Sequence, residues 1–172
     1  MAINVEGNFF DKEIFGYELR KAQLLTKFAK LCAKIKKDDG FRRRVKDLYL
    51  GSFDQKKTLC SIYRNECHVD LNEEETQLIY RCFDAFLKKN DYRKRFSDDF
   101  RERLIFQQDG QCAICKCLIS NEFVNKVHVD HIIPWQLVGD ELDDNYQALC
   151  PKCNREKHSS LDYLLRVRLG LR

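Results

Sequence analysis

The chain has 172 residues, of which 44% are hydrophobic and 34% charged, and it contains only two prolines. This composition excludes a disordered chain, because enough apolar surface is available to form a core. No apolar run approaches the roughly 20 residues that cross a bilayer, and residues 1–10 lack the basic and apolar stretches of a secretion signal. We therefore expect a cytoplasmic protein without membrane contact.

The net charge of +4 is unevenly distributed along the chain. Residues 17–46 carry eleven Lys or Arg and three acidic residues, so this stretch has a net charge of +8 and the remainder −4. Such an asymmetry is typical of a surface that faces a polyanion, although a solvated helix face gives the same pattern. The candidate contacts are Lys27, Lys30, Lys34, Arg42, Arg43 and Arg44.

The first hundred residues predict helices. Apolar residues at helical spacing predict one helix over 17–37, another over 41–49 and a weaker one over 55–64. Asn72 followed by Glu75 resembles a capping box and starts a further helix, and Ser97 or Asp98 can cap another. We expect residues 1–96 to form a basic helical region that binds nucleic acid or a partner.

The pattern changes after the Asp109-Gly110 turn. Val127–Ile133 is a β-branched run suited to a strand, Asn145–Leu149 suits a second, and the chain after Pro151 predicts a helix through Leu171. We expect residues 97–172 to form a separate compact module, which gives an α+β fold.

Nine cysteines in a reducing compartment indicate metal binding where they cluster. Two Cys-x2-Cys pairs have the spacing at which four thiolates bind one tetrahedral Zn²⁺, and four protein ligands leave no open position, so we expect a structural zinc. These ligands are Cys112, Cys115, Cys150 and Cys153. Cys117 is an alternate ligand that fits the spacing less well. The remaining cysteines, Cys32, Cys60, Cys67 and Cys82, suit buried apolar positions.

A second group of polar residues lies between and beside the cysteine pairs. Asp130 and His131 follow the predicted strand, and Asn145, Asn154 and His158 come at intervals of fourteen, nine and four positions. Carboxylate and amide oxygens are hard ligands that suit Mg²⁺, and a histidine with an ordinary pKa is available as a base near neutral pH.

The segment from about Arg101 to Lys157 resembles the HNH (ββα-metal) endonuclease family. The resemblance is carried by the first cysteine pair, Asp-His-Ile-Ile-Pro, and Asn-Tyr-Gln-Ala-Leu-Cys-x2-Cys-Asn with a closing Lys. It is greatest to the four-cysteine branch, which includes restriction enzymes and a phage junction-resolving nuclease. The resemblance implies a β-hairpin followed by a helix, with one divalent ion between them.

By position, the resemblance implies that Asp130 and Asn154 bind a catalytic Mg²⁺ or Mn²⁺, that His131 is the general base and that Asn145 braces the loop. His158 matches a metal-binding histidine of the colicin-like branch; it is either a third ligand or a helix-surface residue. Arg155 and Lys157 beside it suit contacts to phosphate.

The resemblance implies a DNA endonuclease, with RNA left open as a substrate, that serves restriction, phage defence or a mobile element. A homodimer or a protein partner is compatible with it. The rival interpretation is a non-catalytic zinc module that binds nucleic acid or protein within a larger complex.

Overall fold

The structure is a computed structural model that describes residues 12–119 and 127–163. The expectation made for residues 1–10 lies outside these ranges. The elements, in chain order, are α1 (Lys12–Lys37), α2 (Asp39–Leu50), α3 (Gln55–Cys67), α4 (Glu73–Lys88), α5 (Asp98–Gln107), β1 (His128–His131), α6 (Trp135–Val138), β2 (Tyr146–Leu149) and α7 (Pro151–Lys157). The predicted α+β class is confirmed. None of the described helices is long and apolar enough to span a membrane.

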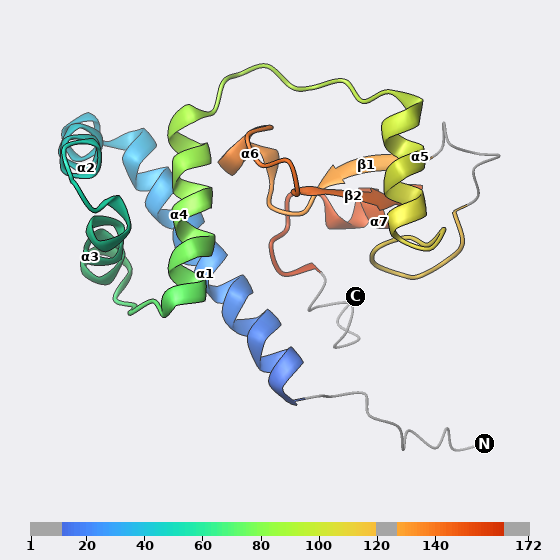
Figure 1. Cartoon of the computed structure of the whole chain (residues 1–172), viewed down its shortest axis with the longest axis horizontal. Helices are drawn as coiled ribbons and strands as arrows, with labels where there is room; N and C mark the ends of the chain where they lie inside the picture. The colour runs from blue at the N-terminus through green and yellow to red at the C-terminus, as the bar shows by residue number, and fades with distance from the viewer. Residues whose placement is uncertain (1–11, 120–126, 164–172) are drawn as a thin grey trace.

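Helices α1 to α4 pack against one another and form a helical layer, seen on the left of Figure 1. Side-chain caps define where three of them begin, because Asp38, Asp54 and Asn72 each accept a hydrogen bond from a backbone N–H of the first turn. At α4 the carboxylate of Glu75 also accepts from the Asn72 amide, so the predicted capping box is present.

The core of the helical layer is built from large side chains with almost no exposed surface. The most buried are Phe28, Tyr49, Tyr63, Phe83, Leu24, Ile35, Leu59 and Ile79. Burial of each such side chain contributes about 1.5–3 kcal/mol of hydrophobic stabilisation. Ile133 and Val138 belong to the same cluster, since the short helix α6 packs against α4. The helical layer therefore supports the loop that follows β1.

The remaining elements form a small module on the right of Figure 1. Strands β1 and β2 pair antiparallel, with Asp130 opposite Gln147 and His131 opposite Tyr146. Helix α7 contacts both strands and α5 contacts β2, which gives the hairpin-then-helix arrangement expected. A separate core joins α5, the two strands and α7 around Leu104, Ile105, Ala148 and Leu149, whereas α6 packs on the core of the helical layer.

Two sequence-based boundaries need correction. The predicted helix from Pro151 through Leu171 is correct for Pro151–Lys157 but too long, because α7 ends at Lys157 and His158 takes a positive φ of 50°. Residues 164–172 lie outside the described ranges. The first strand is also shorter than the predicted Val127–Ile133, since the chain leaves β1 after His131 and turns at Pro134 into α6, an element the sequence did not predict.

Candidate active site and four-cysteine cluster

The four predicted zinc ligands gather at one point. The Sγ atoms of Cys112, Cys115, Cys150 and Cys153 all lie within 4.8 Å of one another. A tetrahedral zinc with Zn–S bonds of about 2.3 Å requires sulfur pairs about 3.8 Å apart, and Cys115 Sγ and Cys150 Sγ are separated by 3.8 Å. The cluster is therefore compatible with one Zn²⁺.

Backbone N–H groups contact two of the clustered sulfurs. The Cys150 thiol caps α7 by accepting from the Cys153 amide at 3.5 Å, and the Cys150 amide points at Cys112 Sγ at 3.4 Å. These N–H···S contacts hold the Cys112 and Cys150 sulfurs in place within the cluster. Cys117 contributes its backbone carbonyl, which accepts from the Cys112 amide, and its thiol is not among the four clustered sulfurs.

Asp130 on β1 presents one carboxylate oxygen to the protein and leaves the other open. Its Oδ2 accepts from Gln147 Nε2 at 2.8 Å and pairs with Lys157 Nζ at 2.9 Å. Oδ1 accepts no hydrogen bond from any described residue. Asp130 is thus held rigidly while it keeps one hard oxygen free for a ligand outside the chain.

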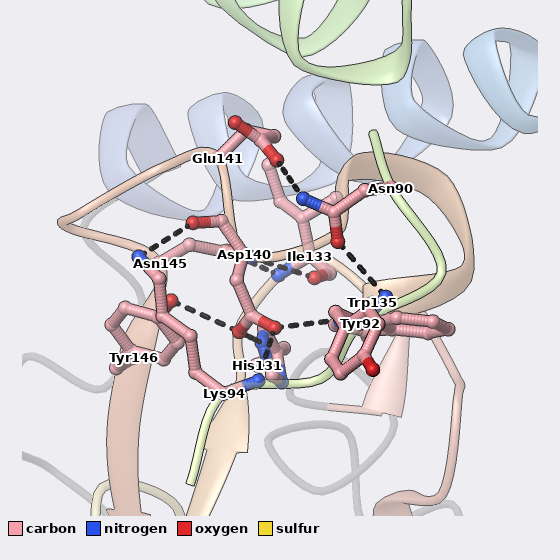
Figure 2. A network of polar contacts seen from close by, with 10 residues as sticks. All are labelled: Asn90, Tyr92, Lys94, His131, Ile133, Trp135, Asp140, Glu141, Asn145 and Tyr146. Atoms are coloured by element: carbon pink, nitrogen blue, oxygen red, sulfur yellow. Dashed lines mark hydrogen bonds and ion pairs between the residues drawn. The ribbon is translucent and has the colours of Figure 1, made fainter. Parts of the chain in front are cut away.

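His131 is almost completely buried, with 2% of its surface exposed. Its Nε2 lies 2.9 Å from Oδ1 of Asp140, a carboxylate that comes from the turn after α6 and that the sequence did not single out. Asp140 also accepts from the hydroxyl of Tyr146, the indole of Trp135 and the backbone amide of Lys94. Figure 2 shows these donors converging on the Asp140 carboxylate.

The hydrogen bonds around Asp140 determine the tautomer of His131. Burial alone raises the pKa of Asp140, but the hydrogen bonds from Lys94, His131, Trp135 and Tyr146 outweigh it, so the pKa lies below its usual value. An ionised carboxylate accepts a hydrogen bond from Nε2–H, and this favours the tautomer in which Nδ1 carries the lone pair. Nδ1 makes no hydrogen bond to any described residue.

Asn145 is buried just before β2 and bridges the loop that follows β1. Its side-chain oxygen accepts from the Ile133 amide at 2.7 Å, and its side-chain nitrogen donates to the Ile133 carbonyl at 2.8 Å. This pair of bonds fixes the turn that carries His131 to Pro134. The position is the one at which the resemblance implied a loop-bracing residue.

Asp130, His131, Asn154 and His158 line one cavity of about 240 Å³. Arg93, Pro134, Trp135, Gln136 and Ser159 complete its lining. The Asn154 carboxamide makes no hydrogen bond to the described residues, so its oxygen, like Oδ1 of Asp130, has no partner among them. These two donors suit a hard divalent ion such as Mg²⁺, with room for water and phosphate oxygens. Among the described residues, however, the four cysteines are the one cluster of His, Cys, Asp or Glu side chains close enough to hold a metal by themselves.

The environment of Lys157 argues against its predicted role as a surface phosphate contact. Only 5% of its surface is exposed, and its ammonium donates to the His131 carbonyl at 2.8 Å and pairs with Asp130. Removing this cation from the Asp130 carboxylate would leave a partly buried charge without a partner. Lys157 therefore holds Asp130 and the end of β1 in place. Arg155 on the same helix is exposed.

The basic residues of the helical layer divide into two groups. Lys27 donates to the Cys67 carbonyl, Lys34 pairs with Glu66 and Arg42 pairs with Asp39. Lys30 and Arg43 are exposed and form no hydrogen bond or ion pair with the described residues, and Arg44 lies 5.9 Å from the Phe41 ring. Contact of this surface with nucleic acid remains a prediction.

Comparison with known proteins matches the same part of the chain. Residues 112–160 match the model of the HNH endonuclease family. No curated protein and no solved structure matches the chain significantly. The matched segment contains both cysteine pairs and every residue of the cavity that comes from β1, α6 and α7.

Proposed function

Because residues 112–160 form an HNH module with a four-cysteine cluster, we propose that this protein is a metal-dependent endonuclease that hydrolyses DNA phosphodiester bonds. The observation that carries the proposal is the shared cavity of Asp130, His131 and Asn154. A zinc module that only binds needs its four cysteines, but it has no use for an oriented histidine beside two open oxygen donors.

Each residue of the cavity has a role in this reaction. Asp130 Oδ1 and the Asn154 side-chain oxygen would hold a Mg²⁺ or Mn²⁺ ion, with His158 as a further donor in reach of the same cavity. When bound, such an ion supplies positive charge for the scissile phosphate and for the departing O3′. The four-cysteine zinc stabilises the fold and takes no part in the chemistry.

His131 acts as the general base. Asp140 holds the proton on Nε2, so Nδ1 accepts a proton from the attacking water. In-line attack of this water forms the new P–O bond and breaks the bond to O3′, which leaves a 5′-phosphate and a 3′-hydroxyl. Asp140 then stabilises the imidazolium that results, because its carboxylate carries the opposite charge.

One such site cuts one strand, so double-strand cleavage needs a dimer or two successive nicks. We propose restriction, phage defence or a mobile element as the biological setting. Support for the setting comes from the resemblance to the four-cysteine branch alone.

Nicking of supercoiled plasmid tests the proposal. We expect relaxed circles with Mg²⁺ or Mn²⁺, none with EDTA, and a loss of about 10²–10⁴-fold in His131→Ala with its zinc content intact. His128→Ala, which removes an exposed histidine from the same strand, is the matched control and should cut like the unaltered protein. Wild-type protein that binds plasmid but never nicks it with any divalent ion would support the non-catalytic zinc module instead.

A further inference from the structure

Residues 89–96 connect α4 to α5 without regular secondary structure, and we call them the strap. Figure 1 shows the strap running from the helical layer to the module. Its first residue, Lys89, places its ammonium 4.0 Å from the centre of the Trp135 ring and packs against Gly139, where a Cβ would come within 2.9 Å of the Lys89 side chain. The start of the strap is therefore fitted closely to the loop around α6.

The end of the strap is fixed to the catalytic histidine and its partners. The backbone amide of Lys94 donates to Asp140 Oδ2 at 2.9 Å, and its ammonium donates to the Asp140 carbonyl at 3.0 Å. The Phe96 ring lies 4.9 Å from Tyr146 and 6.5 Å from His131. Figure 2 shows Lys94 beside Asp140. A segment outside the matched family region thus forms part of the wall around the site.

Arg93 lies between these two anchored ends and lines the catalytic cavity. It is exposed and forms no hydrogen bond or ion pair with any residue of 12–119 or 127–163. All five N–H donors of its guanidinium are therefore free of protein acceptors. Lys157, a cation of the module that contacts both Asp130 and His131, is already paired with Asp130.

The charged residues around the cavity indicate which ligand Arg93 can bind. Lys157 is paired with Asp130, and Arg93 is the one Lys or Arg among the described residues that line the cavity. A guanidinium binds two oxygens of one phosphate in a fork that a lysine ammonium cannot reproduce. We propose that Arg93 binds the non-bridging oxygens of a backbone phosphate of the substrate, at or beside the scissile position. This inference rests on the proposed function, because it names the substrate contact of the same site.

The test separates binding from cutting. Binding to a fluorescent DNA duplex is measured by anisotropy across a salt series, in a His131→Ala background, for Arg93→Ala, Arg93→Lys and Arg95→Ala. Arg95 is an exposed arginine of the strap that does not line the cavity, so it serves as the matched control. We expect Arg93→Ala to weaken binding and to reduce the slope of log K against log salt by about 1, which is the loss of one phosphate contact. Arg93→Lys should keep the slope but bind more weakly, and Arg95→Ala should change neither.

Nicking is then measured with His131 restored. Arg93→Ala should lower kcat/KM by about 10²-fold, as expected for a lost donor to the reacting phosphate, with zinc content and helix content unchanged. Equal salt slopes and equal nicking for Arg93→Ala and Arg95→Ala overturn the inference, as does absence of DNA binding by the His131→Ala protein. If the wild-type protein binds DNA but does not nick it, the proposed function fails, while the salt slopes still decide whether Arg93 contacts phosphate.

Discussion

The helical layer and the module are stabilised by different kinds of contact. The layer has large, fully buried aromatic and aliphatic side chains from four helices. The module has two strands of four residues each, a short helix, and a polar network around Asp140 and Asn145 beside four clustered thiols. Apolar packing thus stabilises the layer, whereas the module relies on polar contacts that also form the site, beside a thiol cluster that is compatible with zinc.

Removal of one zinc ligand should give the largest difference in stability between the helical layer and the module. Cys150→Ser should abolish zinc binding and unfold the module, because structural zinc contributes on the order of 10 kcal/mol in small zinc domains. Helices α1 to α4 should persist. Hydrogen exchange measured by region, with zinc counted by mass spectrometry, checks this outcome. Cys60→Ser, at a half-buried cysteine outside the cluster, is the control; equal protection of the module in both variants would show that zinc does not hold it.

Asp140→Asn should affect both stability and activity in the module. The amide cannot accept from all four donors, so we expect a loss of roughly 1–3 kcal/mol in the free energy of unfolding. The wrong tautomer of His131 should lower nicking by roughly 10–100-fold, the range found for outer partners of functional histidines. Thermal unfolding and plasmid nicking measure the two effects, and unchanged nicking would mean that Asp140 does not orient the base.

The same carboxylate predicts a dependence of stability on pH. Because the pKa of Asp140 is lowered on folding, its contribution is present above the ordinary Asp pKa of about 3.9 and is lost as the pH falls through the lower folded value. Asp140→Asn should therefore make unfolding less sensitive to acid below about pH 4. A parallel loss of stability in both proteins as the pH falls would contradict the ionised state assigned to Asp140.

Removal of a surface ion pair between the helical layer and the module should give the smallest change in the free energy of unfolding. Arg81 on α4 pairs with Asp144 at 2.5 Å, with 45% and 65% of the two side chains exposed. We expect Arg81→Ala to cost less than about 1 kcal/mol, since exposed pairs are screened by solvent. Arg64→Ala, which breaks an exposed pair between α3 and Asp70, is the comparison within the layer. Chemical denaturation measures both, and a much larger cost for Arg81→Ala would show that the pair is a main contact between layer and module.

The features that follow local rules were predictable from the sequence. Apolar spacing and the Asn72–Glu75 cap predicted the helices, because both signals act within one helix. The two cysteine pairs predicted the cluster, since the chemistry of zinc requires that spacing. The resemblance brought Asp130, His131 and Asn154 together before any contact was known, and they line one cavity.

Contacts between distant segments were not predictable in this way. Asp140 carries no local signal, and it acquires its role because three aromatic or imidazole groups and the Lys94 amide meet it in space. Lys157 was predicted as a phosphate contact because a lysine beside the site suits that role. Its burial depends on Asp130, which lies 27 positions earlier in the chain. Arg93 was overlooked because the strap contains no motif.

The proposed structural zinc and the proposed catalytic ion can be distinguished by removing and restoring them separately. Protein freed of loosely bound ions on a metal-free column, with zinc counted by mass spectrometry, is assayed for plasmid nicking before and after addition of Mg²⁺ or Mn²⁺. We expect one retained zinc per chain and no nicking before the addition. After the addition, we expect nicking by the unaltered protein but not by Asn154→Ala or His131→Ala. Nicking by the zinc-only protein, or no nicking with any divalent ion, would contradict the assignment.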